Sequence, residues 1–244
     1  MADKPLRIAM WGGPRNISTA LMRSWGNRPD TFVCDEPFYG YYLDQTGLPH
    51  PGADEIVEHH ETDWRKIADW LTGPIPEGKS VFYQKQMAHH LLPDVELDWL
   101  DQLTSCFLIR EPREMVTSLI HFIPKPTPND TGMPQQWHIY EHVKSKTGVA
   151  PIVIDSMDVL LDPRGMQSKI CESLGIEFNE AMLSWPTGRR ATDGIWAKHW
   201  YTSVEKTTGF GSYRHKDDQV PDELLGLLDE CNEIYDRFRE LCLT

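Results

Sequence analysis

The chain has 244 residues, of which 40% are hydrophobic and 10% aromatic, and its formal net charge is −13. This composition is sufficient to bury a core, which excludes a disordered chain and a disulfide-bonded miniprotein. No stretch approaches the roughly 18 consecutive apolar residues that a membrane-spanning helix needs. The negative charge argues against a nucleic-acid-binding protein, because such proteins face phosphates with cationic groups.

The termini and cysteines bear on the cellular compartment. Residues 1–5 carry an acid and lack an apolar segment, so we expect no secretory signal. The five cysteines are scattered without paired spacing. We therefore expect reduced thiols and a cytoplasmic location.

Short apolar runs alternate with segments of helical periodicity. The strand candidates are residues 6–10, 31–34, 80–86, 104–109 and 151–154. The helix candidates are residues 18–25, 64–71, 163–174 and 221–241, and a segment that begins at Pro112. Strands that alternate with helices predict an α/β fold with a mostly parallel central sheet flanked by helices. No break in composition divides the chain, so we expect one domain over residues 1–244.

Residues 121–133 contain three prolines, Pro124, Pro126 and Pro128. Proline at this density predicts a loop rather than a regular element. The position of the loop, after the helix that begins at Pro112, makes it a candidate lid over an acceptor.

Residues 11–20 form a predicted phosphate loop, in which a strand ends in a Gly-rich turn and a helix begins. Such a turn points backbone N–H groups and a helix N-terminus at one spot, which suits a phosphate. Arg15 adds a fixed charge, and Ser18 and Thr19 add hydroxyl donors that can also cap the helix. A helix cap alone explains the segment equally well. The candidate ligand-binding residues are Gly13, Pro14, Arg15, Asn16, Ile17, Ser18 and Thr19.

A second candidate anion site lies in residues 107–118. An apolar strand ends at Arg110, a helix starts two residues later, and Ser118 lies two turns into that helix. A guanidinium and a hydroxyl together can bind an anion. The alternative is that Arg110 forms surface salt bridges with Glu111 and Glu114.

Together the two segments resemble the sulfotransferases that use 3′-phosphoadenosine 5′-phosphosulfate (PAPS). Pro14-Arg15 with Ser18-Thr19 is similar to the loop that binds the 5′-phosphosulfate in that family. Arg110-Glu111-Pro112-Arg113 with Ser118 is similar to the segment that binds the 3′-phosphate. A third similarity, a strand, an Asp-Pro pair and a helix ending in Leu-Gly, covers residues 152–176. The resemblance implies a P-loop fold of the sulfotransferase type.

The sequence also departs from the family pattern. Asn16-Ile17 stands where the family has Ser-Gly, and Glu111 replaces Asp or Asn. The C-terminal Arg-Lys-Gly segment of the family is not evident. The nearest substitute is residues 206–214, which makes Lys206 and Arg214 candidate clamps on the donor.

The resemblance implies metal-independent, in-line transfer of a sulfuryl group to a hydroxyl or amine of a small molecule or carbohydrate. Arg15 and Lys85 are the candidate cations for the leaving phosphate. Glu36 stands where carbohydrate-modifying members of the family carry a glutamate base, and His89 and His90 are the alternative bases.

Two other functions remain open at this point. A nucleotide kinase or hydrolase could share the fold, although the chain lacks the Gly-Lys-Ser/Thr that a triphosphate loop needs. A non-catalytic nucleotide-binding protein could keep the anion sites alone. We expect no metal site, since the adjacent His59 and His60 are typical of a solvated loop. A homodimer is possible.

Overall fold

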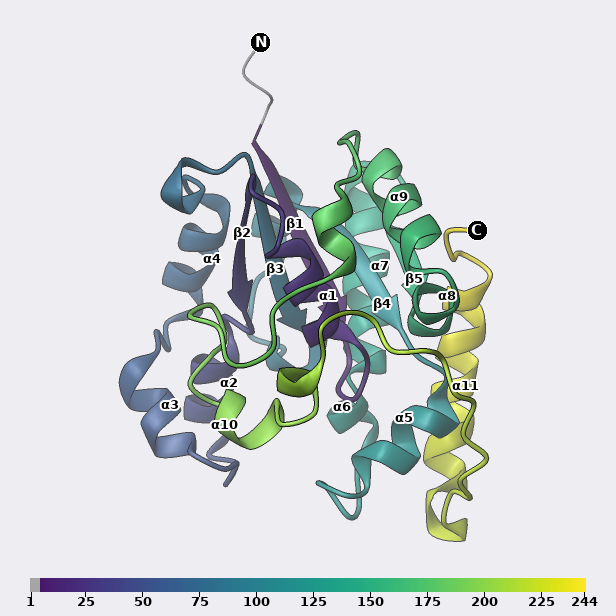
Figure 1. Cartoon of the computed structure of the whole chain (residues 1–244). Coiled ribbons are helices and arrows are strands. Elements are labelled where there is room, and N and C mark those ends of the chain that lie inside the picture. Colours follow the sequence, from purple (N-terminus) through teal and green to yellow (C-terminus); the bar gives the residue numbers. More distant parts are fainter. Residues whose placement is uncertain (1–4) are drawn as a thin grey trace.

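The structure is a computed structural model that describes residues 5–244 (Figure 1). The residues that bear on a secretory signal lie mostly outside this range. A five-stranded sheet, with strand order β2-β3-β1-β4-β5, forms the centre, and every strand pair is parallel. The predicted α/β fold is therefore confirmed. The strands are β1 (Leu6–Gly12), β2 (Thr31–Asp35), β3 (Val81–Met87), β4 (Thr104–Ile109) and β5 (Ile152–Asp155).

Helices cover both faces of the sheet. They are α1 (Ser18–Trp25), α2 (Tyr39–Thr46), α3 (Ala53–His59), α4 (Trp64–Thr72), α5 (Pro112–Leu119), α6 (Pro128–Thr131), α7 (Met133–Thr147), α8 (Ser156–Leu161), α9 (Pro163–Ser173), α10 (Ala197–Trp200) and α11 (Leu225–Arg239). Within residues 5–244, none of them is long and apolar enough to cross a membrane.

Alternate residues of β1 face two separate cores, as the period of two in a strand requires. Ile8 and Met10 pack with α1 and α9 on one face. Ala9 and Trp11 pack with α4, α7 and α11 on the other. Because all four side chains are fully buried, β1 is an apolar run rather than an alternating one, which is typical of a central parallel strand.

The structure corrects the expectation that residues 121–133 form a loop throughout. Thr127 and Asp130 cap each other reciprocally at the start of α6, with Pro128 in the first turn, and α7 begins at Met133. A capping box followed by proline at the first helical position predicts a helix start, and this signal was present in the sequence. The rest of the segment, residues 121–127, has no regular secondary structure.

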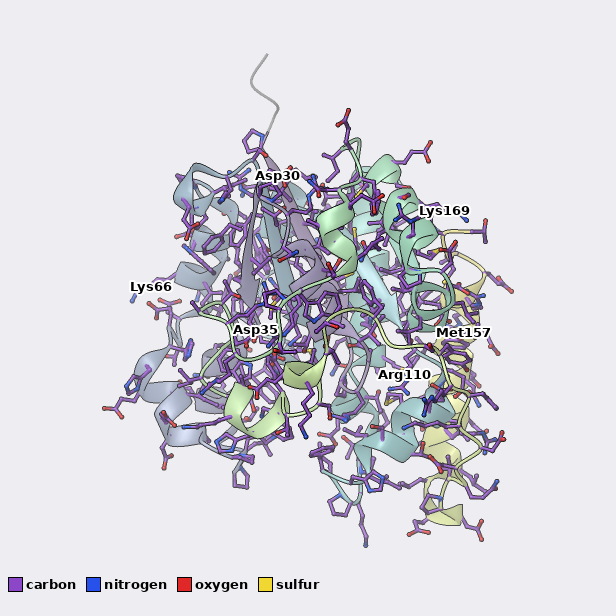
Figure 2. All side chains as sticks on the ribbon, in the orientation of Figure 1. Asp30, Asp35, Lys66, Arg110, Met157 and Lys169 are labelled. Carbon is purple, nitrogen blue, oxygen red and sulfur yellow. The ribbon has the colours of Figure 1, made fainter. Side chains whose placement is uncertain are left out.

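The sheet topology fixes where the functional residues meet. From β1 the chain runs to β2, which lies on one side of β1 in the sheet. From β3 it crosses to β4, which lies on the other side of β1. Ligands bind in parallel α/β sheets at the carboxyl ends of strands where the direction of winding changes. At that edge, Lys85 of β3 is the register partner of both Met10 and Asp35. Figure 2 places Asp35 and Arg110 at the lower end of the sheet, and Asp30 at the upper end.

Candidate active site

The phosphate loop joins β1 to α1 through a left-handed residue. Arg15 has φ +60°, a conformation that non-glycine residues rarely adopt. Asn16 follows it, and its Oδ1 accepts a hydrogen bond of 2.9 Å from the backbone N–H of Ser18. The position that is glycine in the family is Ile17, which has φ −92° and needs no glycine here. The loop is therefore closed by the hydrogen bond of the Asn16 side chain and by the left-handed turn at Arg15.

The loop lies against both ends of the candidate lid, residues 121–133. A Cβ atom at Gly13 would lie 2.4 Å from the backbone oxygen of Thr131, so only glycine fits there. The Arg15 guanidinium lies over the Phe122 ring, 4.5 Å from its centroid. Phe122 in turn contacts Trp200, with ring centroids 5.4 Å apart. Residues 121–133 thus border the phosphate loop, while opening and closing of a lid remains a prediction.

The two predicted anion segments meet in space. The Nε of Arg15 donates a 3.0 Å hydrogen bond to Ser118 Oγ, and Arg110 donates to the backbone oxygen of Arg15. Burial and the positive charge of Arg110 both lower the pKa of Arg15. No carboxylate within residues 5–244 forms an ion pair with Arg15. The arrangement leaves positive charge at the loop uncompensated, as a binding site for an anion requires.

A buried carboxylate holds Arg110 in place. Glu114, one turn into α5, pairs with Arg110 at 3.0 Å, and its side chain is 4% exposed. The other oxygen of Glu114 accepts a 2.9 Å hydrogen bond from Tyr213 Oη. The salt bridge that the sequence left as an alternative is therefore present. It is partly buried, and Arg110 remains 20% exposed, so Arg110 can contact both Glu114 and a ligand.

Lys85 lies at the centre of a second polar group. Its ammonium donates to Asp35 Oδ1 at 2.9 Å, to Tyr201 Oη at 2.7 Å and to Glu36 Oε1. Burial alone would lower the pKa of Lys85, but the charges of Asp35 and Glu36 outweigh it and raise this pKa well above its usual value. Lys85 is therefore a buried, fixed cation, rather than a solvated lysine at the end of a strand.

Glu36 follows β2 in a left-handed conformation, with φ +42°. Its backbone N–H donates to the backbone oxygen of Lys85 at 2.9 Å, which fixes the turn against β3. Burial raises the pKa of Glu36, and the neighbouring charge of Lys85 lowers it only in part. A carboxylate with a raised pKa is a stronger base than an ordinary glutamate.

The alternative bases have a different environment. Burial and the charge of His50 lower the pKa of His89 to about 4. His90 is 2% exposed and stacks between Tyr39 and Tyr42, with ring centroids 4.7 Å and 4.8 Å away. These contacts give His90 a packing role, and a pKa near 4 makes His89 a weak base. The identity of the base stays a prediction, with Glu36, His89 and His90 as the candidates.

The C-terminal candidates lie on different parts of one strap, residues 185–214. Lys206 is exposed on a short 3-10 turn, Val204–Lys206. Arg214 is exposed next to Tyr213, which contacts Glu114. The strap therefore passes beside Arg110 at its end. The roles of Lys206 and Arg214 as donor clamps remain predictions.

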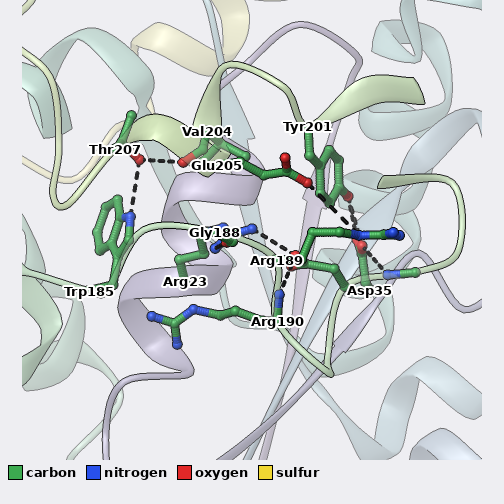
Figure 3. Close-up of polar contacts among 12 residues, drawn as sticks. Arg23, Asp35, Trp185, Gly188, Arg189, Arg190, Tyr201, Val204, Glu205 and Thr207 are labelled. Atoms are coloured by element: carbon green, nitrogen blue, oxygen red, sulfur yellow. Dashed lines mark hydrogen bonds and ion pairs between the residues drawn. The ribbon is translucent and has the colours of Figure 1, made fainter. Parts of the chain in front are cut away.

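Tyr201 also belongs to this polar group, through contacts with Lys85 and Asp35 that the sequence does not indicate. Its hydroxyl lies 2.8 Å from both carboxylate oxygens of Asp35, and Asp35 also accepts a 3.0 Å hydrogen bond from the backbone N–H of Gly194 (Figure 3). The strap is tied to α1 as well, because Arg23 bonds Asp193 at 2.7 Å and Gly188 at 2.8 Å. Nothing local in the sequence indicates these contacts, which join residues more than a hundred positions apart.

The sequence profile of the family described as "Sulfotransferase domain" matches residues 6–229. The chain belongs to the sulfotransferase domain family. The matched range includes the candidate site from the phosphate loop to Tyr213.

Two curated relatives of this sulfotransferase domain come from Arabidopsis thaliana. The branched-chain-amino-acid aminotransferase-like protein 2 is 31% identical over 234 residues, 95% of this chain and 41% of the relative. The aminotransferase-like protein 1 is 31% identical over 237 residues, 97% of this chain and 42% of the relative. The chain thus spans about two-fifths of the length of these relatives.

Solved sulfotransferase structures share the fold at low sequence identity. The sulfotransferase from Alicyclobacillus acidocaldarius superimposes with a TM-score of 0.52 and 12% identity, over 97% of this chain and 95% of that one. The sulfotransferase domain from the curacin biosynthetic pathway gives a TM-score of 0.50 and 13% identity, over 98% and 92% of the two chains.

Proposed function

We propose that this protein is a sulfotransferase that moves a sulfuryl group from PAPS to a hydroxyl or amine of a small-molecule or carbohydrate acceptor. One observation carries the proposal: Arg15 and Arg110 meet at the phosphate loop, and Arg15 has no carboxylate partner among the described residues. Membership of the sulfotransferase domain family supports it.

The residues at the loop fit a donor with two separate phosphate groups. The left-handed turn at Arg15 and the start of α1 would hold the 5′-phosphosulfate through backbone N–H groups. Arg110 and Ser118 would hold the 3′-phosphate. The side-chain nitrogen of Asn16 is buried beside the loop and has no hydrogen-bond partner in the described part of the chain, so it is a donor that a ligand could use.

PAPS would supply the sulfuryl group, and the chain would supply charge and a base. Lys85 is buried and cationic, and with Arg15 it would neutralise charge that develops on the leaving phosphate. Glu36 would take the proton from the acceptor. In the structure Lys85 donates to Glu36 Oε1, so this contact must open before Lys85 donates to the leaving phosphate through that hydrogen.

Calorimetric titration with adenosine 3′,5′-bisphosphate (PAP), with and without Mg²⁺, tests the donor assignment, and ATP is the comparator. We expect PAP to bind equally well with and without Mg²⁺, and ATP to bind weakly. A preference for Mg²⁺-ATP would contradict the proposal and favour a kinase or hydrolase. Binding of PAP without any turnover of PAPS, across a panel of hydroxyl and amine acceptors, would favour a nucleotide-binding protein. The cytoplasmic location and a homodimer stay predictions.

A further inference from the structure

The ammonium of Lys85 has no hydrogen left for a ligand in this structure. A lysine ammonium carries three N–H donors. Those of Lys85 go to Asp35, Glu36 and Tyr201, and the Lys85 side chain is only 2% exposed. To donate to a ligand, Lys85 must release one of the three partners.

The three partners differ in how firmly they are held. The Asp35 side chain is 1% exposed. Both of its oxygens lie 2.8 Å from the Tyr201 hydroxyl, and one of them also accepts a hydrogen bond from the Gly194 N–H. Tyr201 is 5% exposed and contacts both Asp35 oxygens. Glu36 is 12% exposed, and within residues 5–244 its carboxylate has one other polar contact besides Lys85, the Tyr201 hydroxyl at 3.5 Å. Glu36 is therefore the partner that can leave.

We propose that Tyr201 is a positioning residue, which together with Asp35 keeps Lys85 aimed at the reaction site when Glu36 leaves it. The inference rests on the proposed function, since it assigns roles within the same site. After Glu36 moves, two bonds remain on Lys85, and the third N–H points to the space that Glu36 occupied. The same movement frees the base and one donor of the cation together.

The scaffold fixes Tyr201 independently of Lys85. Tyr201 directly follows α10 and belongs to the strap, which Arg23 anchors at Asp193 and Gly188. Arg23 and Asp193 are both fully buried at their side chains. A hydroxyl held this way can orient a lysine without following the movement of Glu36.

The charged and titratable groups around Glu36 come from four elements. They are Asp35 at the end of β2, Lys85 in β3, Tyr201 after α10 and Tyr39 at the start of α2. Of these, Lys85 and Tyr201 contact the Glu36 carboxylate. The Tyr201 hydroxyl lowers the pKa of Glu36, although burial is the larger influence and raises it. Removing the hydroxyl is therefore expected to raise that pKa.

The test compares Tyr201→Phe with the unmodified protein and with Tyr235→Phe. The control removes a phenol that donates to another carboxylate, Asp155, at 2.5 Å, from α11. We expect kcat of Tyr201→Phe to fall by roughly 10- to 100-fold, as misplacement of a reacting group does. The KM for PAPS and the affinity for PAP should not change. The acid limb of the kcat profile should move to higher pH, and Tyr235→Phe should leave all four quantities unchanged.

A second readout needs no turnover. In protein labelled with ¹⁵N-lysine, the buried Lys85 ammonium should give an Nζ signal protected from exchange with water, assigned by its loss in Lys85→Arg, which keeps the positive charge. Tyr201→Phe should speed the exchange, and Tyr235→Phe should not. If Tyr201→Phe does not fold, the unmodified protein still allows a test of the contact between Tyr201 and Lys85. Its Tyr201 hydroxyl proton should be visible and show a nuclear Overhauser effect to the Lys85 ammonium.

The outcomes separate the two proposals. Unmodified protein that neither binds PAP nor transfers a sulfuryl group contradicts the proposed function, whatever Tyr201 does. Active protein whose Tyr201→Phe variant keeps kcat and its acid limb contradicts the positioning role alone. A uniform loss at all pH values, with weaker PAP binding, would also overturn it, because that pattern indicates a purely structural residue. Absence of a protected Lys85 signal in the unmodified protein would also overturn the positioning role of Tyr201.

Discussion

Arg15 and Ser118 are 103 residues apart in the chain and are joined by a 3.0 Å hydrogen bond from Nε to Oγ. The bond connects the phosphate loop to α5, so the two anion segments form one site before any ligand binds. Because Ser118 Oγ is the acceptor of this bond, its own hydroxyl hydrogen can still donate to an anion. One ligand group can therefore contact Ser118 while Arg15 stays bonded to it, which links the Arg110 end of the site to the Arg15 side chain.

Arg110→Ala should weaken the binding of PAP much more than that of AMP, since only PAP carries a 3′-phosphate. Loss of a charge-assisted bond costs about 1.5–3 kcal/mol, or roughly 10- to 100-fold in Kd. Calorimetry with both nucleotides measures the difference. Arg65→Ala is the control, an exposed arginine on α4 that should change neither affinity. Equal losses for PAP and AMP would contradict the 3′-phosphate assignment.

Glu36→Gln should keep PAP affinity and suppress transfer, because the amide cannot accept the acceptor's proton. The pH dependence of the unmodified enzyme gives a second check. A base acts only when deprotonated, and the pKa of Glu36 is raised. The acid limb of kcat should therefore lie above the pH at which an ordinary glutamate titrates, and activity should fall as the pH drops through it. Full activity of Glu36→Gln would move the base to His89 or His90.

Lys85→Met should destabilise the fold strongly, since it leaves two buried carboxylates, Asp35 and Glu36, without a counter-charge. Removing one partner of a buried ion pair costs about 3–5 kcal/mol. Urea denaturation measures the free energy of unfolding. The deficit should shrink at acidic pH, because a protonated carboxyl needs no counter-charge.

The matched control for this change is Lys66→Met on α4. Lys66 pairs with Glu61 at 3.4 Å, and both side chains are exposed. An exposed pair contributes about 0–1 kcal/mol, so the control should be nearly neutral. Similar losses in the two variants would mean that the Lys85 group is not a buried ion-pair network.

Local sequence patterns were sufficient to predict the strands of the sheet and the candidate site residues that lie at or just after the strand ends. The strands are apolar runs that end in turn residues, and the parallel order then brings Glu36, Lys85 and Arg110 to one edge. α2 and α7 were not predicted. α2 begins with Tyr39-Gly40-Tyr41-Tyr42, residues of modest helix propensity. Its tyrosines are buried, so tertiary packing rather than local preference stabilises the helix.

The remaining site residues depend on contacts that no local pattern encodes. Tyr201 reaches Lys85 across 116 positions, and Arg23 reaches Asp193 across 170. The sequences of the segments that carry these residues indicate only a local strand, helix or turn. Tyr201 and Asp193 reach these partners because the strap folds back over the ends of the strands. Only the three-dimensional structure shows this arrangement.

The left-handed backbone at Arg15 and Glu36 lowers the stability of the fold at two residues that we place in the proposed site. Each residue holds a conformation that costs of order 1–3 kcal/mol for a side chain other than glycine. Glycine at either position would relieve that cost and remove a guanidinium or a carboxylate from the site. Selection for thermal resistance alone would therefore favour glycine at these two positions, at the expense of the roles proposed for Arg15 and Glu36. Persistence of arginine and glutamate there during directed evolution would mark selection for chemistry rather than for folding.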